Sequence, residues 1–432
     1  MEKNDTLEHS FNRGRSEMKI AHFSWEFPPA IWGGLGTFAA EITQKQASLG
    51  NEVTVFAVNN ENKLNTLDRW NGVEVYRPKT LDLTSSFYLF SNQDLRSWGS
   101  NFNFFANVLG YNVMSASKLV DLLVRKNGRS FDIIEGHDWL GIFGGMIAKK
   151  ELDVPLVFHV HSTEVGRSGG GGSFTIKNIE YEGAQIADCV ITVSYSMKDE
   201  LKKLGFPEDK IRVCWNGIDP DKYDPQKISH DEKIQLRRRY GVADDEHLLF
   251  FIGRLVTIKG VENLVKAMPS VLEDFPNTKL VILGVGELDE GIRSLINSLN
   301  ISEKIVLRTE FVSEQERILH YAAADSVVLP SLYEPFGIVC TEAMSMAKPV
   351  VVGARGTSGM REQIIPDGEN QCGVHMNPYN PNDIAWGIKQ VLESKEKSMQ
   401  MGVNARKRVI EQFSWDTVAN RTLDIYKEFV KR

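Results

Sequence analysis

The sequence predicts an α/β protein with two doubly wound parallel-sheet domains. Short runs of β-branched and aromatic residues alternate with segments of helical periodicity from residue 18 to residue 215. The alternation stops between 216 and 244, where the chain is charged and contains proline, and it restarts at 247. A chain of 432 residues is long enough for two such domains, each with its own core.

Six apolar runs in the first half have the length and composition of strands. They cover 19–25, 52–58, 131–137, 155–161, 189–194 and 210–215. Helical periodicity occupies the intervening segments 37–49, 114–124 and 179–186. Because strands joined by crossover helices run parallel, the first half predicts one parallel sheet covered by helices.

The second half repeats this organisation and ends in one amphipathic helix. Strands are expected at 247–254, 279–286, 304–309, 326–330 and 348–353, and the final helix at 414–430. We therefore expect a flexible polar tail at 1–17, domains at 18–215 and 216–413, and a C-terminal segment, 414–432, that packs back toward the first domain. Loops at the carboxyl ends of the strands in both halves would then line a ligand site between the domains.

Composition excludes several classes of protein. The chain has 50 basic and 57 acidic residues, a net charge of −7, which disfavours broad binding to nucleic acid. Four cysteines without a CxxC spacing indicate buried thiols in a reducing compartment. No apolar run approaches the ~20 residues that cross a bilayer, and the first 17 residues lack the apolar stretch of a signal peptide. We expect a cytoplasmic protein without membrane association, and the sequence leaves its oligomeric state open.

A glycine pair follows the first predicted strand, within EFPPAIWGGLGTFAAEI. Gly33 and Gly34 precede a helix, and free N–H groups at a helix N-terminus suit a phosphate. A tight turn between strand and helix explains the same residues. The GxGxxG pattern of a dinucleotide fold is absent from this turn.

Two clusters of polar residues end neighbouring strands of the first half. They are Glu135-Gly136-His137-Asp138-Trp139 and Phe158-His159-Val160-His161-Ser162-Thr163-Glu164. Strand ends of this kind hold ligand contacts in α/β folds, although histidines with a purely structural role fit the pattern too. A zinc site at His159 and His161 is disfavoured because no third ligand lies nearby in the sequence.

Two cations follow the first strand of the second half. Arg254 directly follows HLLFFIG, and Lys259 lies ahead of the next helix. Arginine binds a diphosphate in a fork and lysine binds it as a point charge, so the pair predicts a diphosphate contact rather than only solvated loop charges.

Two acids bracket a predicted turn in SLYEPFGIVCTEAM, residues 331–344. Glu334 lies in the turn, Gly337 lies near the start of a helix, and Glu342 lies within that helix. At ~1.5 Å per residue, Glu342 is roughly 7–8 Å along the axis from Gly337, about the span from a phosphate to its ribose. One acid can bind a sugar, the helix N-terminus a phosphate, and the second acid a ribose. A glycosidase would need its two carboxylates to face each other across one bond.

These motifs resemble the retaining glycosyltransferases of the GT-B fold, and most closely family 4 with its archaeal and bacterial glycogen synthase-like members. The resemblance runs from Met18 to the end of the chain. It is carried by WEFPP-x3-GGLG, GHDW, HVHSTEVGR, NGID, GR-x4-KG, EPFG-x4-EA and the final FSW. It implies two Rossmann-like domains that face an interdomain cleft.

The resemblance also implies a role for each matching residue. Glu334 contacts the donor sugar, and the backbone of Phe336, Gly337 and Ile338 holds sugar and phosphate. Arg254 and Lys259 neutralise the diphosphate, Glu342 binds the ribose, and Gly33 and Gly34 approach the phosphates from the first domain. His161 lies beside the reacting sugar, and Asp138 lies near the donor or acceptor.

The resemblance implies retention of configuration, no metal and no cofactor, with a nucleotide-sugar donor and a carbohydrate acceptor as partners. Glycogen and starch synthases of bacteria have K-x-G-G-L in the first loop, where this chain has Ile31-Trp32-Gly33-Gly34-Leu35. Their E-P-x-G-L is Glu334-Pro335-Phe336-Gly337-Ile338 here, and the segment 353–364, GARGTSGMREQI, also differs. These differences leave the nucleotide base and the sugar open.

The resulting hypothesis is a hexosyltransferase that moves glucose from ADP- or UDP-glucose to an α-1,4-glucan. The alternative within the class is a glucosyl- or mannosyltransferase with a small-molecule or lipid-linked acceptor. A nucleotide-sugar epimerase would share the two-domain shape, but the Glu-x7-Glu spacing disfavours it. A sugar-binding protein without activity remains the last alternative.

Overall fold

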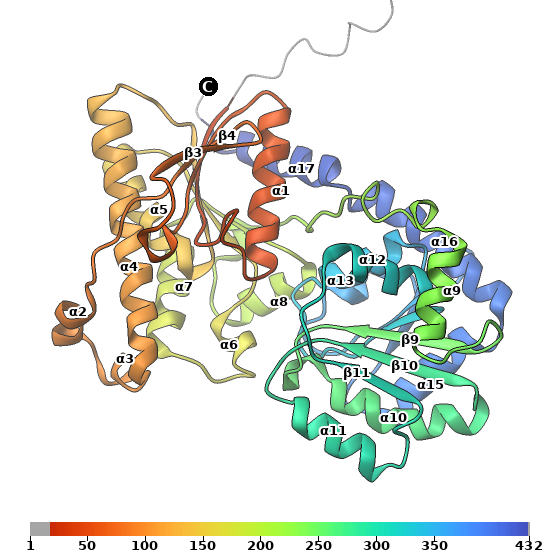
Figure 1. Cartoon of the computed structure of the whole chain (residues 1–432). Coiled ribbons are helices and arrows are strands. Elements are labelled where there is room, and N and C mark those ends of the chain that lie inside the picture. The colour runs from red at the N-terminus through yellow and green to blue at the C-terminus, as the bar shows by residue number, and fades with distance from the viewer. Residues whose placement is uncertain (1–17, 431–432) are drawn as a thin grey trace, which may run out of the picture.

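The computed structural model describes residues 18–430, and the tail expected at 1–17 lies outside this range. Within the described residues the chain forms two α/β domains, and the final helix returns to the first of them (Figure 1). The two-domain parallel-sheet architecture expected from the sequence is confirmed.

The first domain contains an eight-stranded sheet in the described part of the chain, in the order β3-β4-β2-β1-β5-β6-β7-β8. Neighbouring strands are parallel except the β3–β4 pair. The strands are β1 (Lys19–Phe23), β2 (Glu52–Phe56), β3 (Leu67–Trp70), β4 (Val73–Tyr76), β5 (Ile133–His137), β6 (Leu156–Val160), β7 (Cys189–Thr192) and β8 (Ile211–Val213).

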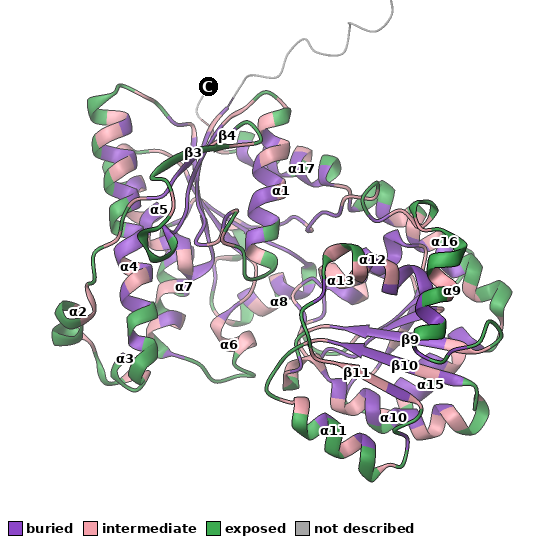
Figure 2. Ribbon diagram, in the orientation of Figure 1, coloured by how far each residue is buried: buried purple, intermediate pink, exposed green. Residues whose placement is uncertain are grey.

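Helices cover this sheet and supply its connections. They are α1 (Gly34–Ser48), α2 (Thr84–Phe90), α3 (Gln93–Arg96), α4 (Phe102–Ser117) with a π-helical continuation (Lys118–Lys126), α5 (Asp138–Leu152), α6 (Glu164–Arg167), α7 (Phe174–Ile186) and α8 (Tyr195–Lys203). The central strands β1, β5, β6 and β7 are almost entirely buried, because helices cover both faces of the sheet (Figure 2).

The second domain contains a parallel six-stranded sheet among the described residues, in the order β11-β10-β9-β12-β13-β14. Its strands are β9 (His247–Ile252), β10 (Thr278–Leu283), β11 (Ile305–Arg308), β12 (Ser326–Leu329), β13 (Val350–Gly353) and β14 (Gly373–Met376). Its helices are α9 (His230–Arg239), α10 (Val261–Asp274), α11 (Asp289–Ser298), α12 (Glu314–Ala323), α13 (Ile338–Ser345), α14 (Met360–Gln363), α15 (Pro381–Leu392) and α16 (Lys395–Gln412).

Each strand expected from the sequence is present, and the differences lie at sheet edges and in the linker. The strands β3, β4 and β14 were not expected: they are only four residues long, and β3 and β14 are edge strands. Helix α9 forms inside the segment that had lost its periodicity. Its Ser229–Glu232 capping box stabilises a helix whose residues are almost all polar.

The last helix, α17 (Trp415–Lys427), packs along α1 of the first domain (Figure 1). Trp415 and Tyr426 share a buried cluster with Phe38 of α1 and with residues of β1. Gly217 makes this packing possible, because a Cβ atom at this position would lie 2.4 Å from the Trp415 indole. The NGID motif therefore lies where the chain leaves the first domain, and its glycine packs against the first residue of α17. Within residues 18–430, no helix is both long and apolar enough to cross a bilayer.

We predict that Gly217→Ala lowers the free energy of unfolding by about 1–3 kcal/mol, because the added methyl group overpacks the Trp415 contact. Urea unfolding followed by tryptophan fluorescence measures the change. Gly291→Ala is the matched control: it lies in α11, its added Cβ would meet no atom within 4 Å, and alanine favours the helix. Equal stability of the two variants would contradict the packing argument.

Candidate functional site at the domain interface

Glu334 and Lys259 form an ion pair at the carboxyl end of the second sheet. The Lys259 Nζ atom lies 2.5 Å from Glu334 Oε2, and both side chains are largely buried. The backbone of Glu334 is fixed on both sides, because its N–H donates to Thr357 O at 2.9 Å and its carbonyl accepts from Gly359 N at 2.8 Å. The turn therefore holds the Glu334 carboxylate in a fixed position, beside the ammonium group of Lys259 from the segment after β9.

The turn that follows Glu334 leads into α13 through a left-handed residue. Gly337 has a φ of 93°, and a Cβ atom there would lie 2.6 Å from Met360, so both conformation and space require glycine. Phe336 is buried, and its carbonyl accepts from the Gln363 amide at 2.7 Å. Ile338 lies against the first domain, since a Cβ on Gly34 would be 3.7 Å from its Cδ1 atom. The expected phosphate loops of the two domains therefore meet here.

Glu342 lies on α13 with both carboxylate oxygens already hydrogen-bonded. Tyr223 Oη donates to Oε1 at 2.8 Å and Tyr321 Oη donates to Oε2 at 2.7 Å, and the carboxylate is buried. Arg317 Nη1 lies 3.8 Å away and supplies a positive charge. Burial, and then the neighbouring carboxylate, raise the pKa of the Tyr321 hydroxyl. The two tyrosines were missed from the sequence because nothing in their local pattern marks them. Ribose binding by Glu342 stays a prediction and would use its remaining lone pairs.

Arg254 follows β9 directly, five positions before Lys259 in the chain. Its side chain is exposed and makes no hydrogen bond or ion pair within residues 18–430. An unpaired guanidinium beside a strand end is free to bind an anionic group in a fork.

The glycine pair of the first domain forms the start of α1, with Gly33 as the N-cap. Glu26 was not predicted as part of this loop. Its Oε2 atom accepts from the N–H groups of Trp32 and Gly33, each at 2.9 Å. A Cβ on Gly36 would lie 2.8 Å from the Glu26 carboxylate, so the third glycine makes room for this acid. The loop thus binds a carboxylate of its own, and the Gly33 N-cap supplies no side chain to the first free amides of α1.

Asp138 has a positioning role in this structure. It begins α5 with a φ of 49°, and its Oδ1 atom accepts from His161 N at 2.7 Å and from Ser162 N at 3.4 Å. Burial raises the pKa of the Asp138 carboxyl group. The carboxyl group therefore fixes the backbone at the end of β6, from which His161 extends.

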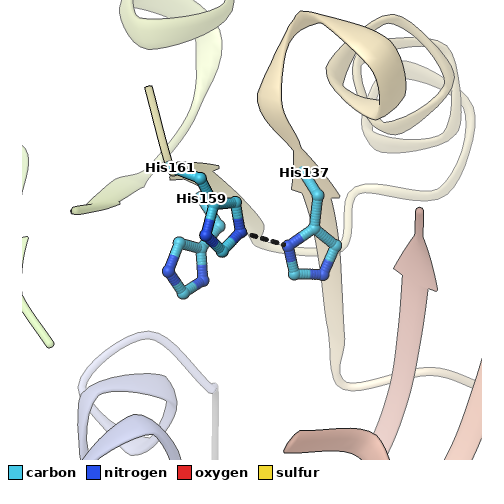
Figure 3. A group of neighbouring side chains, drawn as sticks. All are labelled: His137, His159 and His161. Atoms are coloured by element: carbon cyan, nitrogen blue, oxygen red, sulfur yellow. Dashed lines mark hydrogen bonds between the residues drawn. The ribbon is translucent and has the colours of Figure 1, made fainter. Parts of the chain in front are cut away.

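His137, His159 and His161 lie together at the ends of β5 and β6 (Figure 3). The sequence argument against a metal assumed that no third ligand is close, and His137 is such a neighbour. Donor atoms of the three lie within 4.8 Å of one another, as do those of His22, Glu135 and His137. However, the His159 and His161 rings stack 4.3 Å apart at an angle of 6°. Their in-plane lone pairs run side by side instead of converging, which does not fit a tetrahedral metal.

In the segment that follows His161, Arg167 forms ion pairs with two glutamates. Arg167 Nη2 lies 3.2 Å from both Glu164 Oε2 and Glu180 Oε1, and Glu164 Oε1 accepts from Ser173 N at 2.9 Å. Because Asp138 is a further negative charge nearby, ionisation of every acid is unfavourable. Burial, the larger cause, raises the pKa of Glu180 to about 8. Four consecutive glycines occupy positions 169–172, and Glu164 holds the residue on each side of them, since Ser168 Oγ donates to the Glu164 carbonyl at 2.7 Å and Ser173 N donates to its carboxylate.

Helix α8 of the first domain has Ser194 as its N-cap, and a carboxylate of the second domain binds the first free N–H groups of the helix. The Glu362 carboxylate accepts from Tyr195 N at 2.9 Å and from Ser196 N at 2.7 Å. Ser194 Oγ donates to Pro335 O at 2.7 Å, in the turn that contains Glu334. The segment 353–364, whose contacts the sequence left open, therefore connects the two domains.

Tyr333 makes a second connection between the domains. A Cβ on Gly166 would lie 2.0 Å from its ring, so Gly166 is the residue that admits this side chain. Glu200 of α8 accepts from Thr163 Oγ1 at 2.5 Å and from Thr357 Oγ1 at 2.6 Å, one residue from each domain.

Surface hollows of about 520 and 170 Å³ lie elsewhere, lined in part by Arg212 with Arg421 and by Asp244 with Lys395. They share no residue with the domain interface.

Comparison with known proteins agrees with this architecture. Residues 32–222 match the family model "Glycosyltransferase Family 4", and residues 232–408 match "Glycosyl transferases group 1". An uncharacterised glycosyltransferase of Methanocaldococcus jannaschii is 38% identical over 95% of this chain and 98% of its own. A glycogen synthase of Mycobacterium tuberculosis is 28% identical over 95% of this chain and 94% of its own. Sucrose-phosphate synthase of Thermosynechococcus elongatus superposes with a TM-score of 0.74 at 21% identity, over 95% of this chain and 99% of its own.

The fold and these matches define a glycosyltransferase of the GT-B class. More narrowly, the chain belongs to the family 4 glycosyltransferases of the glycogen synthase-like type.

We predict that Glu180→Gln removes a pH dependence of stability. A carboxyl group whose pKa is raised to about 8 in the folded state stabilises the fold in acid, and this contribution is lost as the pH rises from 4.5 to 8. Relative to wild type, the variant should therefore gain roughly 4 kcal/mol between pH 5 and pH 9. Urea unfolding at both pH values measures this, with Glu182→Gln, exposed on the same helix, as the control. A wild-type-like pH profile would show that Glu180 is ionised throughout.

Proposed function

We propose that this glycosyltransferase moves glucose from ADP- or UDP-glucose to the non-reducing end of an α-1,4-glucan, with retention of configuration and without a metal or cofactor. The observation that carries the proposal is the pairing of Lys259 with Glu334, which lies in the turn that contacts Gly34 of the opposite domain through Ile338. A sugar nucleotide bound there would have its diphosphate near Lys259 and Arg254 and its sugar near Glu334.

The proposed step needs no additional reactant. The bond between the anomeric carbon and the diphosphate oxygen breaks, and the acceptor hydroxyl oxygen bonds to that carbon on the same face. The hydroxyl proton passes to the departing diphosphate. Arg254 is unpaired in the described structure, and Lys259 is paired only with Glu334, so both cations could stabilise the charge that develops on the leaving group.

The glycogen synthase name of the M. tuberculosis relative supports a glucan acceptor. A second acceptor class is favoured by the exposed apolar residues on and before α2, where Leu81, Leu89 and Phe90 are 66%, 73% and 86% exposed. These residues could contact the apolar part of a lipid-linked acceptor. We also propose a reducing, cytoplasmic location, since all four cysteines are buried and unpaired.

A panel of radiolabelled ADP-glucose, UDP-glucose and GDP-mannose, with and without glycogen, tests the function. Label in the polymer supports glucan synthesis. Transfer only to small or lipid-linked acceptors supports the second candidate. Conversion of the donor sugar without transfer would indicate an epimerase, and tight glycan binding without turnover would indicate a binding protein.

We predict that Glu334→Gln leaves the fold intact and lowers kcat by about 10²-fold or more, because the uncharged amide no longer stabilises positive charge on the reacting sugar. Initial rates and circular dichroism measure the two effects. Glu393→Gln, an exposed acid of the same domain, is the control and should have wild-type activity. An unchanged rate in Glu334→Gln would remove this residue from the site.

We predict that Lys259→Ala raises the transition-state free energy by about 2–4 kcal/mol, as expected when a donor to the leaving group is lost. The ratio of kcat/KM between wild type and variant gives this value. Lys266→Ala, exposed on the neighbouring helix α10, is the matched control. Wild-type kcat/KM in Lys259→Ala would mean that this cation does not meet the diphosphate.

A further inference from the structure

A buried hydrogen-bond network leads from the core of the first domain to His161. Its centre is Glu135, which is 1% exposed and lies in the interior of the sheet on β5. Strand register places His22 of β1 directly beside Glu135 and places His159 of β6 beside His137. The network therefore follows from the order β1-β5-β6 and not from proximity in the sequence.

Three donors meet at the Glu135 carboxylate. His159 Nδ1 lies 2.8 Å from Oε1, His22 Nδ1 lies 2.9 Å from Oε2, and the Tyr426 hydroxyl donates to Oε2. Burial alone would raise the pKa of Glu135, but the surrounding histidines hold it well below its usual value. An ionised carboxylate accepts only, so His22 and His159 must each carry a hydrogen on Nδ1. The other nitrogen of His159, Nε2, is buried and has no hydrogen-bond partner among the described residues.

The hydrogen on His22 determines the tautomer of His137. His22 Nδ1 is also 3.1 Å from His137 Nε2, so that nitrogen must accept, since two hydrogens would otherwise face each other. Burial lowers the pKa of His137 to about 3, which keeps the ring neutral. Its single hydrogen is then on Nδ1. The His22 Nε2 atom lies 2.9 Å from Gln46 Oε1, and the Gln46 amide nitrogen contacts Tyr426 Oη at 3.4 Å.

The same argument continues from His137 to His161. His137 Nδ1 lies 3.2 Å from His161 Nε2, the contact drawn in Figure 3, so His161 Nε2 accepts. Burial lowers the pKa of His161 well below its usual value, and the neutral ring therefore carries its hydrogen on Nδ1. His161 is only partly buried, and its Nδ1 atom has no hydrogen-bond partner within residues 18–430. Two residues further on, Thr163 N contacts Tyr333 of the second domain at 3.5 Å.

We propose that Glu135, His22 and His137 are positioning residues that hold His161 as a neutral Nδ1–H tautomer, which donates a hydrogen bond to an oxygen atom of the transferred sugar. The sugar contact rests on the proposed function, whereas the tautomer assignment does not. A ring held in this form is a donor at the domain interface and cannot act there as a general base.

The network also explains why the assignment should be insensitive to pH. Among residues 18–430, the titratable groups that face Glu135 are His22 of β1, His137 of β5, His159 of β6 and Tyr426 of α17 and, more distantly, His161, Cys189 of β7 and Cys214. The direction of the hydrogen bonds that follow depends on the hydrogen of His22 Nδ1, which lies beside the Glu135 carboxylate. While Glu135 stays ionised, the direction of the contacts from His22 to His137 and from His137 to His161 is unchanged.

Nitrogen-15 NMR of the full-length protein with labelled histidine tests the tautomer without any substrate. The His161 signals are assigned by their loss in His161→Ala. We expect a protonated Nδ1 and an unprotonated Nε2 at every pH from 6 to 8.5. A hydrogen on His161 Nε2 in the wild-type protein, or a mixture of both forms, would overturn the proposal.

The Glu135→Gln variant tests the origin of the tautomer. We expect a mixture of tautomers at His161 and a fall in kcat of about 10-fold, with partial recovery of both in Glu135→Asp. His320 of the second domain is an internal control, because its Nδ1 hydrogen bond to the Glu316 carbonyl is independent of Glu135. A folded Glu135→Gln variant with an unchanged His161 tautomer would overturn the role of Glu135. The wild-type spectrum decides the assignment even if this variant does not fold.

Addition of ligand tests the sugar contact separately. UDP-glucose or ADP-glucose should shift the His161 Nδ1 signal, whereas UDP or ADP alone should not. An equal shift with the nucleoside diphosphate alone, or no shift with a sugar nucleotide that demonstrably binds, would overturn the contact with the sugar. If the protein bound no sugar nucleotide, the proposed function would be wrong. The tautomer assignment, which is measured without substrate, would be unaffected.

Discussion

The buried carboxylate of Glu135 is the constraint on which the ligand-facing edge of the first domain depends. An ionised group removed from water is costly unless donors surround it, and here the donors come from β1, β6 and α17. The carboxylate therefore helps to fix the positions of β1, β6 and α17 relative to β5. Because Tyr426 belongs to the last helix, its hydrogen bond to Glu135 also attaches α17 to the first domain. The histidines that pair with Glu135 lead directly to His161 at the domain interface.

The second domain positions its charged residues by a different means. The turn with Glu334 is held through its backbone, between residues 357–359 and the start of α8 in the first domain. Glu362 caps that helix from the other side of the interface, where the exposed N–H groups of a helix N-terminus favour a negative charge. Any rotation of one domain against the other would disturb both contacts. Domain orientation and the geometry around Glu334 are therefore linked, which suits an enzyme that binds one ligand with both halves.

Sequence patterns predicted the interior strands correctly, and they selected residues that the structure brings together at the domain interface, but they did not predict the contacts of those residues. Glu334 and Lys259 were each predicted, but their direct pairing was not. Glu26 could have been found, since an acid just before a glycine-rich turn can accept from its amides. Tyr223 and Tyr321 could not, because they reach Glu342 from two different segments. Separation in the sequence was also a poor guide to which histidines lie together, because His137 lies beside His159 and His161 on the neighbouring strand. The stacking of the His159 and His161 rings is the observation that disfavours a metal at this cluster.

The sequence by itself determined the local features of this protein. Apolar periodicity determined where the buried strands lie, and Gly337 determined a left-handed entry to α13, because both depend on residues close in the chain. Only the tertiary structure decided which polar groups meet. Glu135 with His22, Glu342 with its tyrosines and Glu362 with α8 are pairs from distant segments. Strand order, register and domain packing bring them together, and a hydrogen bond that acts over about 3 Å cannot be inferred from a periodicity that describes one segment at a time.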